Sequence, residues 1–495
     1  MAASGRGADV TGRHKIVIIG SGFGGIGMGI ALRKAGFDDF VILEKAADLG
    51  GTWRDNRYPG CACDVPSPLY SFSYELNPAW SRLFAPQQEI WEYLRGCAAR
   101  YGIDDHIRYR SRVESMEWDD ADRAWIVRTA GGDRYRARAV ISGAGALHIP
   151  SYPEISGIDA FSGASFHSSR WDPSVDLTGK RVAVIGTGAS AIQLVPAVAR
   201  QAAHLAVFQR TPPWIVPRPD TAIPPGMRTA LRTVPGAARA LRYTVYWGME
   251  ARALGFAVHP RLMAPVQTMA RKHLERQVQD PGLRARLTPD YTIGCKRILV
   301  SSDYYPALRR PNVDLVTDAI GEIVPSGVMT TGGAVHEADV LVFATGFRVI
   351  DAATELNVTG RGGAKLKDAW ASGTEALRGI TVPVFPNFFM LLGPNTGLGH
   401  TSVVFMIETQ VQHVLSCLRL LSSQRASTIE ARTAATRKYN DALQRRLRRA
   451  VWSAGGCRSW YLDDAGINRA IWPGFSFEYW ARARRARRAD YHVQA

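Results

Sequence analysis

The sequence predicts an α/β protein with two Rossmann-like dinucleotide-binding domains, the second inserted into the first and carrying a helical insertion of its own. Two stretches predict the domains, because in each a short β-branched run leads through a glycine-rich turn into an apolar helical stretch: residues 15–36 and 180–199. A third observation predicts the inserted order, since ISGAGAL (141–147) and FATGF (343–347) mark two points where the chain crosses between the domains.

The 495 residues are enough for two or three domains with sizeable cores. A hydrophobic content of 46% and a charged content of 21% are typical of a soluble globular protein. No apolar run reaches about 18 residues, so the sequence indicates no membrane span. The N-terminal MAASGRGADVTG is small and polar and lacks the apolar centre of a signal peptide, which predicts a flexible end over residues 1–13 and a cytoplasmic protein.

The cysteines are few for this length and form no regular ladder, so we expect no disulfide framework. The spacing of Cys61 and Cys63 could hold a metal, but no second pair stands at ligand spacing. We therefore expect no metal site.

The formal net charge is +17, and arginines gather near the C-terminus at residues 445–449 and 482–488. Such runs are typical of solvated helix faces. Nucleic acid or an anionic membrane would need this charge around a recognition element, and the sequence indicates none. A basic protein still attracts anionic cofactors.

The first turn, GSGFGG, follows the strand-like IVIIG and opens a helical stretch that reaches Leu32. Gly20 allows the tight turn, Gly22 lets the backbone approach a pyrophosphate, and Gly25 lets helix and strand pack closely. The next strand, FVILEK, leads to Glu44, where a carboxylate can accept both ribose hydroxyls. These features predict a dinucleotide site, the alternative being a glycine-rich turn that binds no ligand.

The second turn, GTGASA, follows the strand-like RVAVI and has Ala191 in place of the third glycine. The strand after it ends on Gln209 and Arg210 without an acid. A carboxylate there would repel a 2′-phosphate, whereas a guanidinium can fork onto it, so this site should prefer NADP to NAD. The alternative for Arg210 is an ordinary surface arginine. Two sites imply electron transfer between two cofactors, with FAD at the first turn and NADPH at the second.

Four stretches in this order resemble the flavin monooxygenases of the Baeyer–Villiger type, and the likeness runs from about residue 14 to about residue 480. They are GSGFGG (20–25), GGTWRDNRYPGCACD (50–64), FSGASFHSSRWD (161–172) and GTGASA (186–191). The third resembles the family's FxGxxxHxxxW fingerprint. Trp171 matters because the related N- and S-oxygenating flavin monooxygenases usually carry tyrosine there.

The resemblance implies an enzyme that uses NADPH, FAD and O2 to insert one oxygen atom next to a ketone carbonyl, giving an ester or lactone through a C4a-peroxyflavin. It implies that Arg297, in GCKRILVSSDYYPAL (294–308), stabilises the charged peroxide and that Asp64 pairs with Arg297. A guanidinium suits this role because it stays protonated, and a carboxylate would orient it and lower the cost of burying it. From the residues alone, a Lys-Arg pair is common on surfaces and Asp64 can be a turn aspartate.

The turns and the resemblance together imply which residues hold the cofactors. The partial match of the tail around Trp460 to the family's mobile loop leaves a packing role for Trp460 open, and Trp53 and Tyr70 can equally be core residues. Those expected at FAD are Gly20, Gly22, Phe23, Gly25, Glu44, Lys45, Thr52, Trp53, Asp64, Tyr70, Val113 and Ala144, and those expected at NADP are Gly186, Thr187, Gly188, Ser190, Ala191, Arg210, Thr211, Lys296 and Trp460.

We interpret the fingerprint as part of a domain linker, residues 151–171, in which Phe161 and Trp171 would anchor the ends by burial and Gly163 would permit a bend. His167 is expected to be structural and coupled to motion rather than catalytic. The other expected units are an FAD domain in two parts (14–150 and 351–495, with the C-terminal tail) and an NADP domain (172–350) whose helical insertion spans about 212–290.

Three other functions stay open. An enzyme that oxygenates amines or sulfides would do without Arg297 and Asp64, whose presence favours the ketone reaction. A flavin-dependent NADPH oxidoreductase that reduces disulfides would carry a CxxC-type pair, and Cys61-x-Cys63 has the wrong spacing. A nucleotide sensor without catalysis is disfavoured by the same Arg297 and Asp64. We expect a small-molecule ketone and O2 as substrates, and a monomer is favoured.

Overall fold

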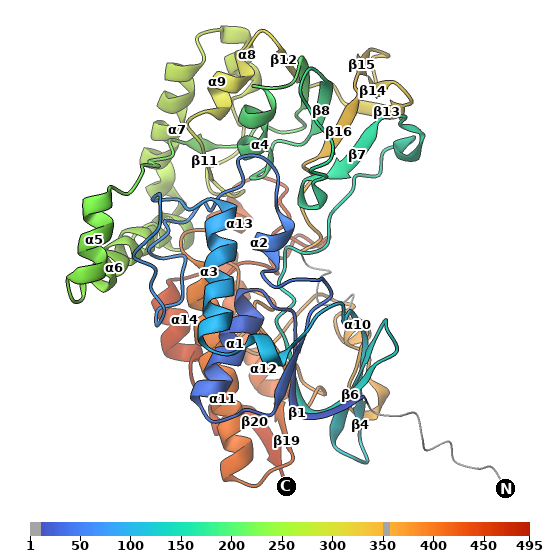
Figure 1. Ribbon diagram of the computed structural model, residues 1–495, viewed down its shortest axis with the longest axis vertical. Coiled ribbons are helices and arrows are strands. Elements are labelled where there is room, and N and C mark those ends of the chain that lie inside the picture. The colour runs from blue at the N-terminus through green and yellow to red at the C-terminus, as the bar shows by residue number, and fades with distance from the viewer. Residues whose placement is uncertain (1–10, 350–356) are drawn as a thin grey trace, which may run out of the picture.

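The structure, a computed structural model, describes residues 11–349 and 357–495. Two sheets form the cores of two domains, the first in the lower half of Figure 1 and the second in the upper half. Most of the expected flexible end, residues 1–13, lies outside the described residues. Its last two residues already belong to strand β1 (Gly12–Ile19), so the expected flexible end is too long.

The first sheet has β1 near its centre. β1 pairs in parallel with β2 (Phe40–Leu43) and β6 (Arg134–Ser142), and its apolar residues 16–19 are buried, as a strand covered on both faces requires. Two strands from the far end of the chain, β17 (Asn357–Thr359) and β18 (Phe388–Met390), pair with β4 and β6, so the end of the chain completes this sheet. The other strands are β3 (Ile107–Arg108), β4 (Val113–Asp119) and β5 (Ala124–Thr129).

Helix α1 (Phe23–Lys34) begins at the first glycine-rich turn and packs beside α3 (Gln87–Arg100) and α11 (Val403–Ser423). α11 follows β18 after a turn. The side chain of Ser402 caps α11 by accepting a hydrogen bond from the Val404 N–H at 3.2 Å.

The second sheet is wholly parallel, in the order β12, β9, β8, β16, β7. Its central strand β8 (Arg181–Ile185) leads through the second glycine-rich turn into α4 (Ala191–Val198), so both predicted Rossmann-like units are present. The other strands are β7 (Ala164–His167), β9 (His204–Phe208), β12 (Val313–Val316) and β16 (Val340–Phe343).

Strand β7 corrects the interpretation of residues 151–171 as a linker, because it pairs with β16 and forms an edge of the second sheet. Phe161 and Trp171 are only half-buried, whereas His167 is fully buried. Glycine is needed at position 163 because the backbone of Asp339 lies close to it, and not because the chain bends there. A Cβ atom on Gly163 would lie 2.3 Å from the Asp339 carbonyl oxygen. The sequence hides this strand because its residues lack the β-branched and aromatic pattern of most strands.

The two segments that cross between the domains lie side by side. Pro150 bridges to Phe347, and the Ser151 N–H donates to the Gly346 carbonyl oxygen at 2.9 Å. Both crossings therefore meet at one hinge between the sheets.

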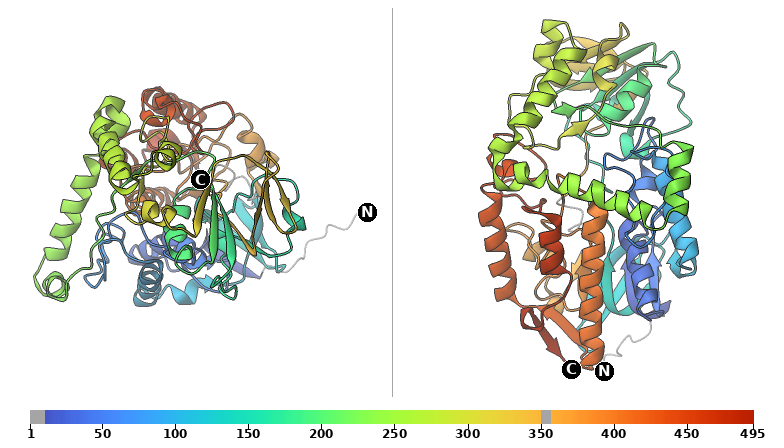
Figure 2. Two further views of the ribbon diagram at one scale, coloured as in Figure 1. Left: turned by 90° about the horizontal axis from the view of Figure 1, so that it is seen from above. Right: turned by 90° about the vertical axis from the view of Figure 1, so that its left-hand side faces the viewer.

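The helical insertion lies between β10 (Ile215–Val216) and β11 (Leu299–Val300), which pair with each other. One of its helices, α6 (Ala237–Glu250), crosses the face of the molecule in the right-hand view of Figure 2. Its other helices are α5 (Pro225–Thr233), α7 (Ala264–Gln277) and α8 (Pro281–Arg286).

The remaining elements are short, apart from α12 in the C-terminal part. Across residues 11–349 and 357–495, no helix is long and apolar enough to cross a bilayer. The elements are α2 (Thr52–Asp55), α9 (Tyr304–Leu308), α10 (Leu366–Ala369), α12 (Thr433–Leu447), α13 (Val451–Ala454), α14 (Ser476–Ala483), the antiparallel β13 (Ile320–Val324), β14 (Gly327–Thr330) and β15 (Val335–Glu337), and the pair β19 (Thr428–Ala431) and β20 (Tyr491–Gln494).

Candidate active site

Asp64 and Arg297 form an ion pair that joins segments far apart in the sequence. Asp64 lies in the loop between α2 and α3, and Arg297 lies just before β11. The guanidinium donates from Nε at 2.9 Å and from Nη2 at 2.6 Å, both to Oδ2 of Asp64. Asp64 raises the pKa of Arg297, whose side chain is still 35% exposed. Arg297 is therefore a permanent cation that Asp64 holds in place and that stays partly accessible.

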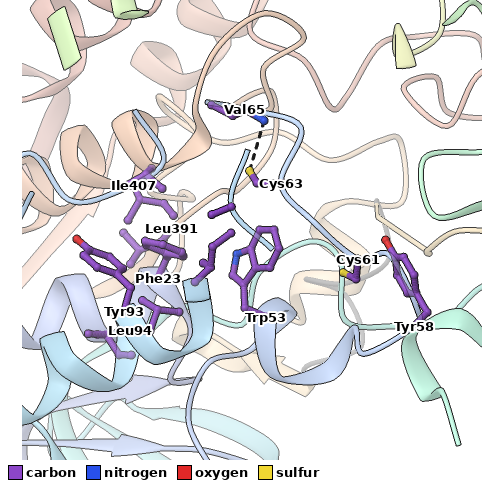
Figure 3. Packing of buried hydrophobic residues seen from close by; sticks show 14 of the residues in the cluster. Phe23, Trp53, Tyr58, Cys61, Cys63, Val65, Tyr93, Leu94, Leu391 and Ile407 are labelled. Atoms are coloured by element: carbon purple, nitrogen blue, oxygen red, sulfur yellow. Dashed lines mark hydrogen bonds between the residues drawn. The ribbon is translucent and has the colours of Figure 1, made fainter. Parts of the chain in front are cut away.

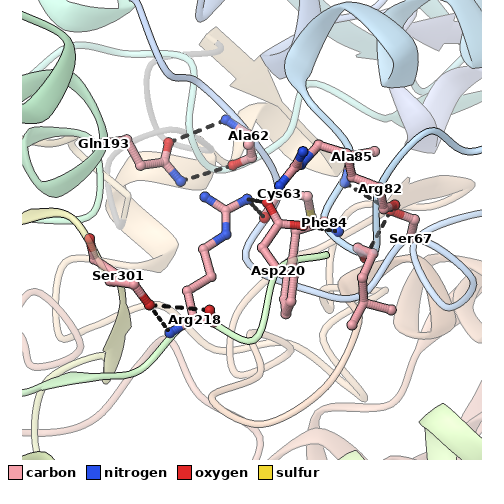
Figure 4. Close-up of polar contacts among 12 residues, drawn as sticks. Ala62, Cys63, Ser67, Arg82, Phe84, Ala85, Gln193, Arg218, Asp220 and Ser301 are labelled. Atoms are coloured by element: carbon pink, nitrogen blue, oxygen red, sulfur yellow. Dashed lines mark hydrogen bonds and ion pairs between the residues drawn. The ribbon is translucent and has the colours of Figure 1, made fainter. Parts of the chain in front are cut away.

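The loop that carries Asp64 is held from the second domain and its insertion. Gln193, on α4, donates from Nε2 to the Ala62 carbonyl oxygen at 3.0 Å and accepts from the Ala62 N–H at 3.4 Å. Arg218 donates to the Cys63 carbonyl oxygen at 3.4 Å, and Figure 4 shows both side chains reaching this loop. The position of Asp64 thus depends on contacts between the domains.

Cys61 and Cys63 are free thiols packed near Trp53 and Tyr58, as Figure 3 shows. Burial raises the pKa of Cys61 to about 12 and that of Cys63 well above its usual range. A thiol that stays protonated is a poor nucleophile, which argues against a reductase that uses this pair. Within the described parts of the chain, no three His, Cys, Asp or Glu side chains form a group that could hold a metal.

A disulfide between Cys295 and Cys457 ties the segment before Arg297 to the C-terminal tail. The sequence does not indicate this bond, because its partners lie 162 residues apart and belong to no spacing motif. The sequence analysis expects no disulfide framework, and this single bond is the one addition to it among the described residues. It also shows that the tail packs against the arginine segment.

In the tail beyond Cys457, the neighbouring residues Trp460 and Tyr461 differ in solvent exposure. Trp460 is 46% exposed and its ring contacts Tyr461 edge-on, with 4.4 Å between the centroids, whereas Tyr461 is buried. The pKa of Tyr461 is raised to about 12, because the effect of burial outweighs the lowering effect of the Arg297 cation. Tyr461 therefore lies in the electric field of the ion pair. A covering role for Trp460 over a nucleotide stays a prediction.

The first glycine-rich turn has no room for a side chain at Gly25. A Cβ atom on Gly25 would lie 1.8 Å from the Gly20 carbonyl oxygen. Gly20 has a φ of 88° and packs against Ala144 at the end of β6. The N–H groups at the start of α1 are therefore held next to a bare backbone surface, where a pyrophosphate could bind.

Glu44 lies buried at the end of β2 beside this turn. Its Oε2 accepts from the N–H and the hydroxyl of Ser21 at 2.9 and 2.7 Å, and Arg54 lies 2.9 Å from its Oε1. Burial raises the pKa of Glu44, but Arg54 and the hydrogen bonds outweigh this and lower it overall. Glu44 is thus an ionised acceptor, and Arg54, which the sequence does not single out, neutralises it.

The other residues expected at FAD surround this turn. Trp53 donates from Nε1 to the Tyr70 hydroxyl at 3.2 Å, and the rings of Phe23 and Tyr70 meet edge-on at 5.3 Å. Lys45 and Thr52 are exposed, while Val113 begins β4 and is buried.

The second turn is more open. Gly186 has a φ of 110°, and a Cβ atom there would lie 2.5 Å from the Ala344 carbonyl oxygen, but Gly188 has no atom within 4 Å of such a Cβ. The Thr187 hydroxyl donates to the Thr211 carbonyl oxygen at 3.2 Å. Ser190 and Ala191 begin α4.

Arg210 adjoins this turn, because the carbonyl oxygen of its neighbour Thr211 accepts from Thr187. Burial and then the charge of Arg210 lower the pKa of Lys296, so the two side chains share one electrostatic environment. Arg210 is exposed. Cations that repel each other in this way offer a site for a polyanion such as a phosphate.

Comparisons with known proteins agree with this arrangement. A family model described as pyridine nucleotide-disulphide oxidoreductase matches residues 17–246. A protein named Baeyer-Villiger monooxygenase from Pseudomonas aeruginosa is 47% identical over 97% of this chain and 92% of its own length. One of the same name from Streptomyces coelicolor is 46% identical over 97% and 92%. This chain belongs to the Baeyer–Villiger monooxygenase family.

Solved structures extend the likeness to the whole Baeyer–Villiger monooxygenase fold. OTEMO in complex with FAD and NADP matches with a TM-score of 0.88 at 28% identity, over 97% of this chain and 99% of that one. A closed structure of cyclohexanone monooxygenase matches with a TM-score of 0.87 at 28% identity, over 98% and 100%. These matches confirm the predicted α/β fold with its Rossmann-like sheets.

The fingerprint histidine of this Baeyer–Villiger monooxygenase is buried at the end of β7. Its Nδ1 accepts from the Ser169 N–H at 3.1 Å. Burial lowers the pKa of His167 to about 4, against an opposing contact with the backbone of Gly346. His167 is therefore neutral near pH 7, and its ring packs edge-on against Tyr152 and Phe347 at the hinge, in keeping with a structural role.

Proposed function

We propose that this Baeyer–Villiger monooxygenase converts a small-molecule ketone into an ester or lactone, with Arg297 and Asp64 as its catalytic pair. One ketone, one O2, one NADPH and one proton would give one ester, one NADP+ and one water. The single observation that carries the proposal is the ion pair of Asp64 with a partly accessible Arg297. A cytoplasmic location and a monomeric state stay predictions.

FAD fits the first turn, because the Gly20–Gly25 contact leaves a bare backbone surface at the start of α1 and Glu44 is an ionised acceptor beside it. Reduced FAD supplies the activated oxygen atom when it is bound there. The residues that would hold it are Gly20, Gly22, Phe23, Gly25, Glu44, Lys45, Thr52, Trp53, Asp64, Tyr70, Val113 and Ala144.

NADPH fits the second turn, because Gly188 leaves open space at the start of α4, Arg210 adjoins the turn through Thr211, and the charge of Arg210 acts on Lys296. NADPH supplies the hydride. The residues that would hold it are Gly186, Thr187, Gly188, Ser190, Ala191, Arg210, Thr211, Lys296 and Trp460.

The chain's own catalytic work is electrostatic. Asp64 binds Nε and Nη2 of Arg297, while Nη1 has no hydrogen-bond partner among the described residues. Nη1 can therefore donate to the negative oxygen that develops as the ketone carbonyl is attacked, and a donor that is already oriented costs no reorganisation at that moment. Gln193 and Arg218 hold the loop of Asp64, and so orient Arg297, through their contacts with Ala62 and Cys63.

The substitution Arg297→Ala tests this assignment. We expect the variant to bind FAD and to reduce it with NADPH in the absence of air, but to form ester at least about 100-fold more slowly, the usual cost of one lost oxyanion donor. Arg297→Lys is the matched control, since lysine keeps the positive charge but lacks the planar guanidinium that donates to Asp64 and to the substrate at once. Gas chromatography of cyclic, linear and aryl ketones gives the readout. Ester formation by Arg297→Ala at a near wild-type rate would overturn the proposal.

A further inference from the structure

Helix α6 displays aromatic side chains that the proposed ketone chemistry does not use. Tyr243 and Trp247 are each 57% exposed, and their spacing of four residues places them on one face of the helix, in line with the exposed Arg239. The ring of Phe477, on α14, lies 5.9 Å from that of Trp247 and is itself exposed. We call Arg239, Tyr243, Trp247 and Phe477 the α6 surface.

The opposite face of α6 is fixed, so these aromatic side chains cannot turn inward. The buried Arg242 donates to the carbonyl oxygens of Leu69 and Ser71 at 3.0 Å each. The buried Glu250 accepts from the Ser476 N–H at 3.0 Å. These contacts hold α6 in one orientation, so its outer face is fixed. The right-hand view of Figure 2 shows the helix at the surface of the molecule.

The chain segment that carries α6 is strongly basic, and Glu478, which adjoins Phe477 on α14, is already paired with Arg446 and Arg482. Between Asp220 and Glu275 the chain carries seven arginines and one lysine but only one acid, the buried Glu250. Five of these arginines are exposed, and no ion pair joins them to a carboxylate within the described ranges. Further exposed apolar side chains accompany them. The arginines are Arg232, Arg239, Arg252, Arg261 and Arg271, and the apolar residues are Leu254, Leu262 and Met269.

We propose that the α6 surface docks onto a lipid bilayer rich in anionic phospholipid. Tryptophan and tyrosine suit the boundary between headgroups and acyl chains, because each has an apolar ring with a polar edge. Arginine pairs with lipid phosphate, and apolar and basic side chains on one rigid helix are the combination that holds a protein in the interface plane. A second copy of this chain fits worse, since two such faces would bring like charges together.

This surface supplies the recognition element that the basic composition alone does not indicate. The net charge of +17 would attract the molecule to an anionic surface before the aromatic side chains insert. No residue of the α6 surface belongs to the catalytic pair or to the glycine-rich turns, so docking and ketone turnover are separable.

Flotation of the FAD-loaded enzyme with vesicles tests the proposal. We expect binding at low ionic strength to vesicles of phosphatidylglycerol and phosphatidylcholine that is at least about tenfold stronger than binding to phosphatidylcholine alone, and that weakens with added salt. Absence of binding to the anionic vesicles would overturn the proposal.

Matched variants locate the contact. The double variant Tyr243→Ser, Trp247→Ser should lose binding by at least about tenfold, and Arg239→Glu should weaken it by about threefold or more. Val335→Ser, which removes an exposed apolar side chain on β15, and Arg200→Glu, which reverses an exposed charge after α4, should bind as the wild type does. All should keep FAD content and ketone turnover. Unchanged binding by the double variant, or its conversion of a lipid-free dimer into a monomer, would reject the assignment.

Discussion

The two glycine-rich turns look alike in sequence but differ in where their need for glycine comes from. In the first turn the protein imposes it, because a Cβ on Gly25 would collide with the Gly20 carbonyl oxygen at 1.8 Å. In the second turn Ala191 occupies the position of Gly25, so the protein tolerates a Cβ there. The protein imposes glycine only at Gly186, whose Cβ would lie 2.5 Å from the Ala344 carbonyl oxygen, whereas Gly188 has open space around it and a need for glycine there would come from a ligand. The charged residues beside the two turns also differ in their exposure. Glu44 beside the first turn is buried and paired with Arg54, whereas Arg210 beside the second turn is exposed.

This difference fits cofactors with different residence times. A sealed turn with a neutralised, buried carboxylate suits a flavin that stays through many turnovers. An open turn with exposed cations suits a nicotinamide nucleotide that must arrive and leave each time, at a rate that electrostatic attraction raises. The same fingerprint therefore serves a permanent site and an exchanging site.

The largest expected effect comes from Gly25→Ala. Its Cβ meets backbone rather than a flexible side chain, so α1 must move away from β1, and we expect a loss of more than about 4 kcal/mol or a protein free of flavin. Flavin absorbance per mole of protein and the thermal midpoint measure this. Gly188→Ala is the matched control, which should keep fold and flavin and raise only the KM for NADPH. A stable, flavin-replete Gly25→Ala would break the comparison.

Glu44→Gln should have the next largest effect, about 3 kcal/mol of stability near pH 7, because the buried Arg54 loses the charge of Glu44 and keeps only Asp55 and the Asp48 carbonyl oxygen as partners. The folded pKa of Glu44 lies below its ordinary value, so its contribution is present above about pH 4.3 and is lost as the pH falls through the lowered folded pKa. Urea unfolding from pH 7 down to pH 3 measures it. An acid profile for Glu44→Gln with the same slope as the wild type would exclude Glu44 as its source.

Arg210→Ala probes the exchanging site and should leave the flavin site untouched. Losing a charge-assisted contact to the 2′-phosphate costs about 1.5–3 kcal/mol, which corresponds to a rise in the KM for NADPH of about 10- to 100-fold. The KM for NADH, which lacks that phosphate, should hardly change. Steady-state kinetics with both nucleotides separate the outcomes, and an equal loss for NADH would mean that Arg210 only supports the fold.

Much of this site follows from short sequence patterns, because glycine turns after buried strands impose the same local geometry wherever they occur. Arg297 and Asp64 could be named through a family resemblance, but the residues that hold them could not. Gln193 and Arg218 act through backbone carbonyl oxygens of a distant loop, and a single polar residue carries no pattern that reveals such a partner. The same holds for Arg54, whose role exists only because folding brings it to Glu44.

In the fold, both parallel units and the helical insertion were predictable from alternating apolar runs and turns. Strand β7 was not, since only Phe166 among its four residues is a typical strand former and its stability comes from pairing with β16 and from burial of Phe166 and His167. The exposure of Tyr243 and Trp247 was also hidden, because aromatic residues at helical spacing are typical of buried faces.

The smallest expected effect comes from breaking the disulfide that connects the second cofactor site to the C-terminal tail. The Cys295–Cys457 disulfide joins the segment of Lys296 and Arg297 to the tail that carries Trp460. Breaking it should loosen the tail while the sealed flavin turn, which shares no residue with it, keeps its cofactor. We expect Cys457→Ser to keep the flavin and to raise the KM for NADPH by no more than about fivefold, the equivalent of about 1 kcal/mol. The fraction of NADPH consumed without ester should rise with it. Reduction of the wild type by a small dithiol should reproduce these changes and leave Cys457→Ser unaffected, whereas loss of flavin on reduction would show that the two sites are not independent.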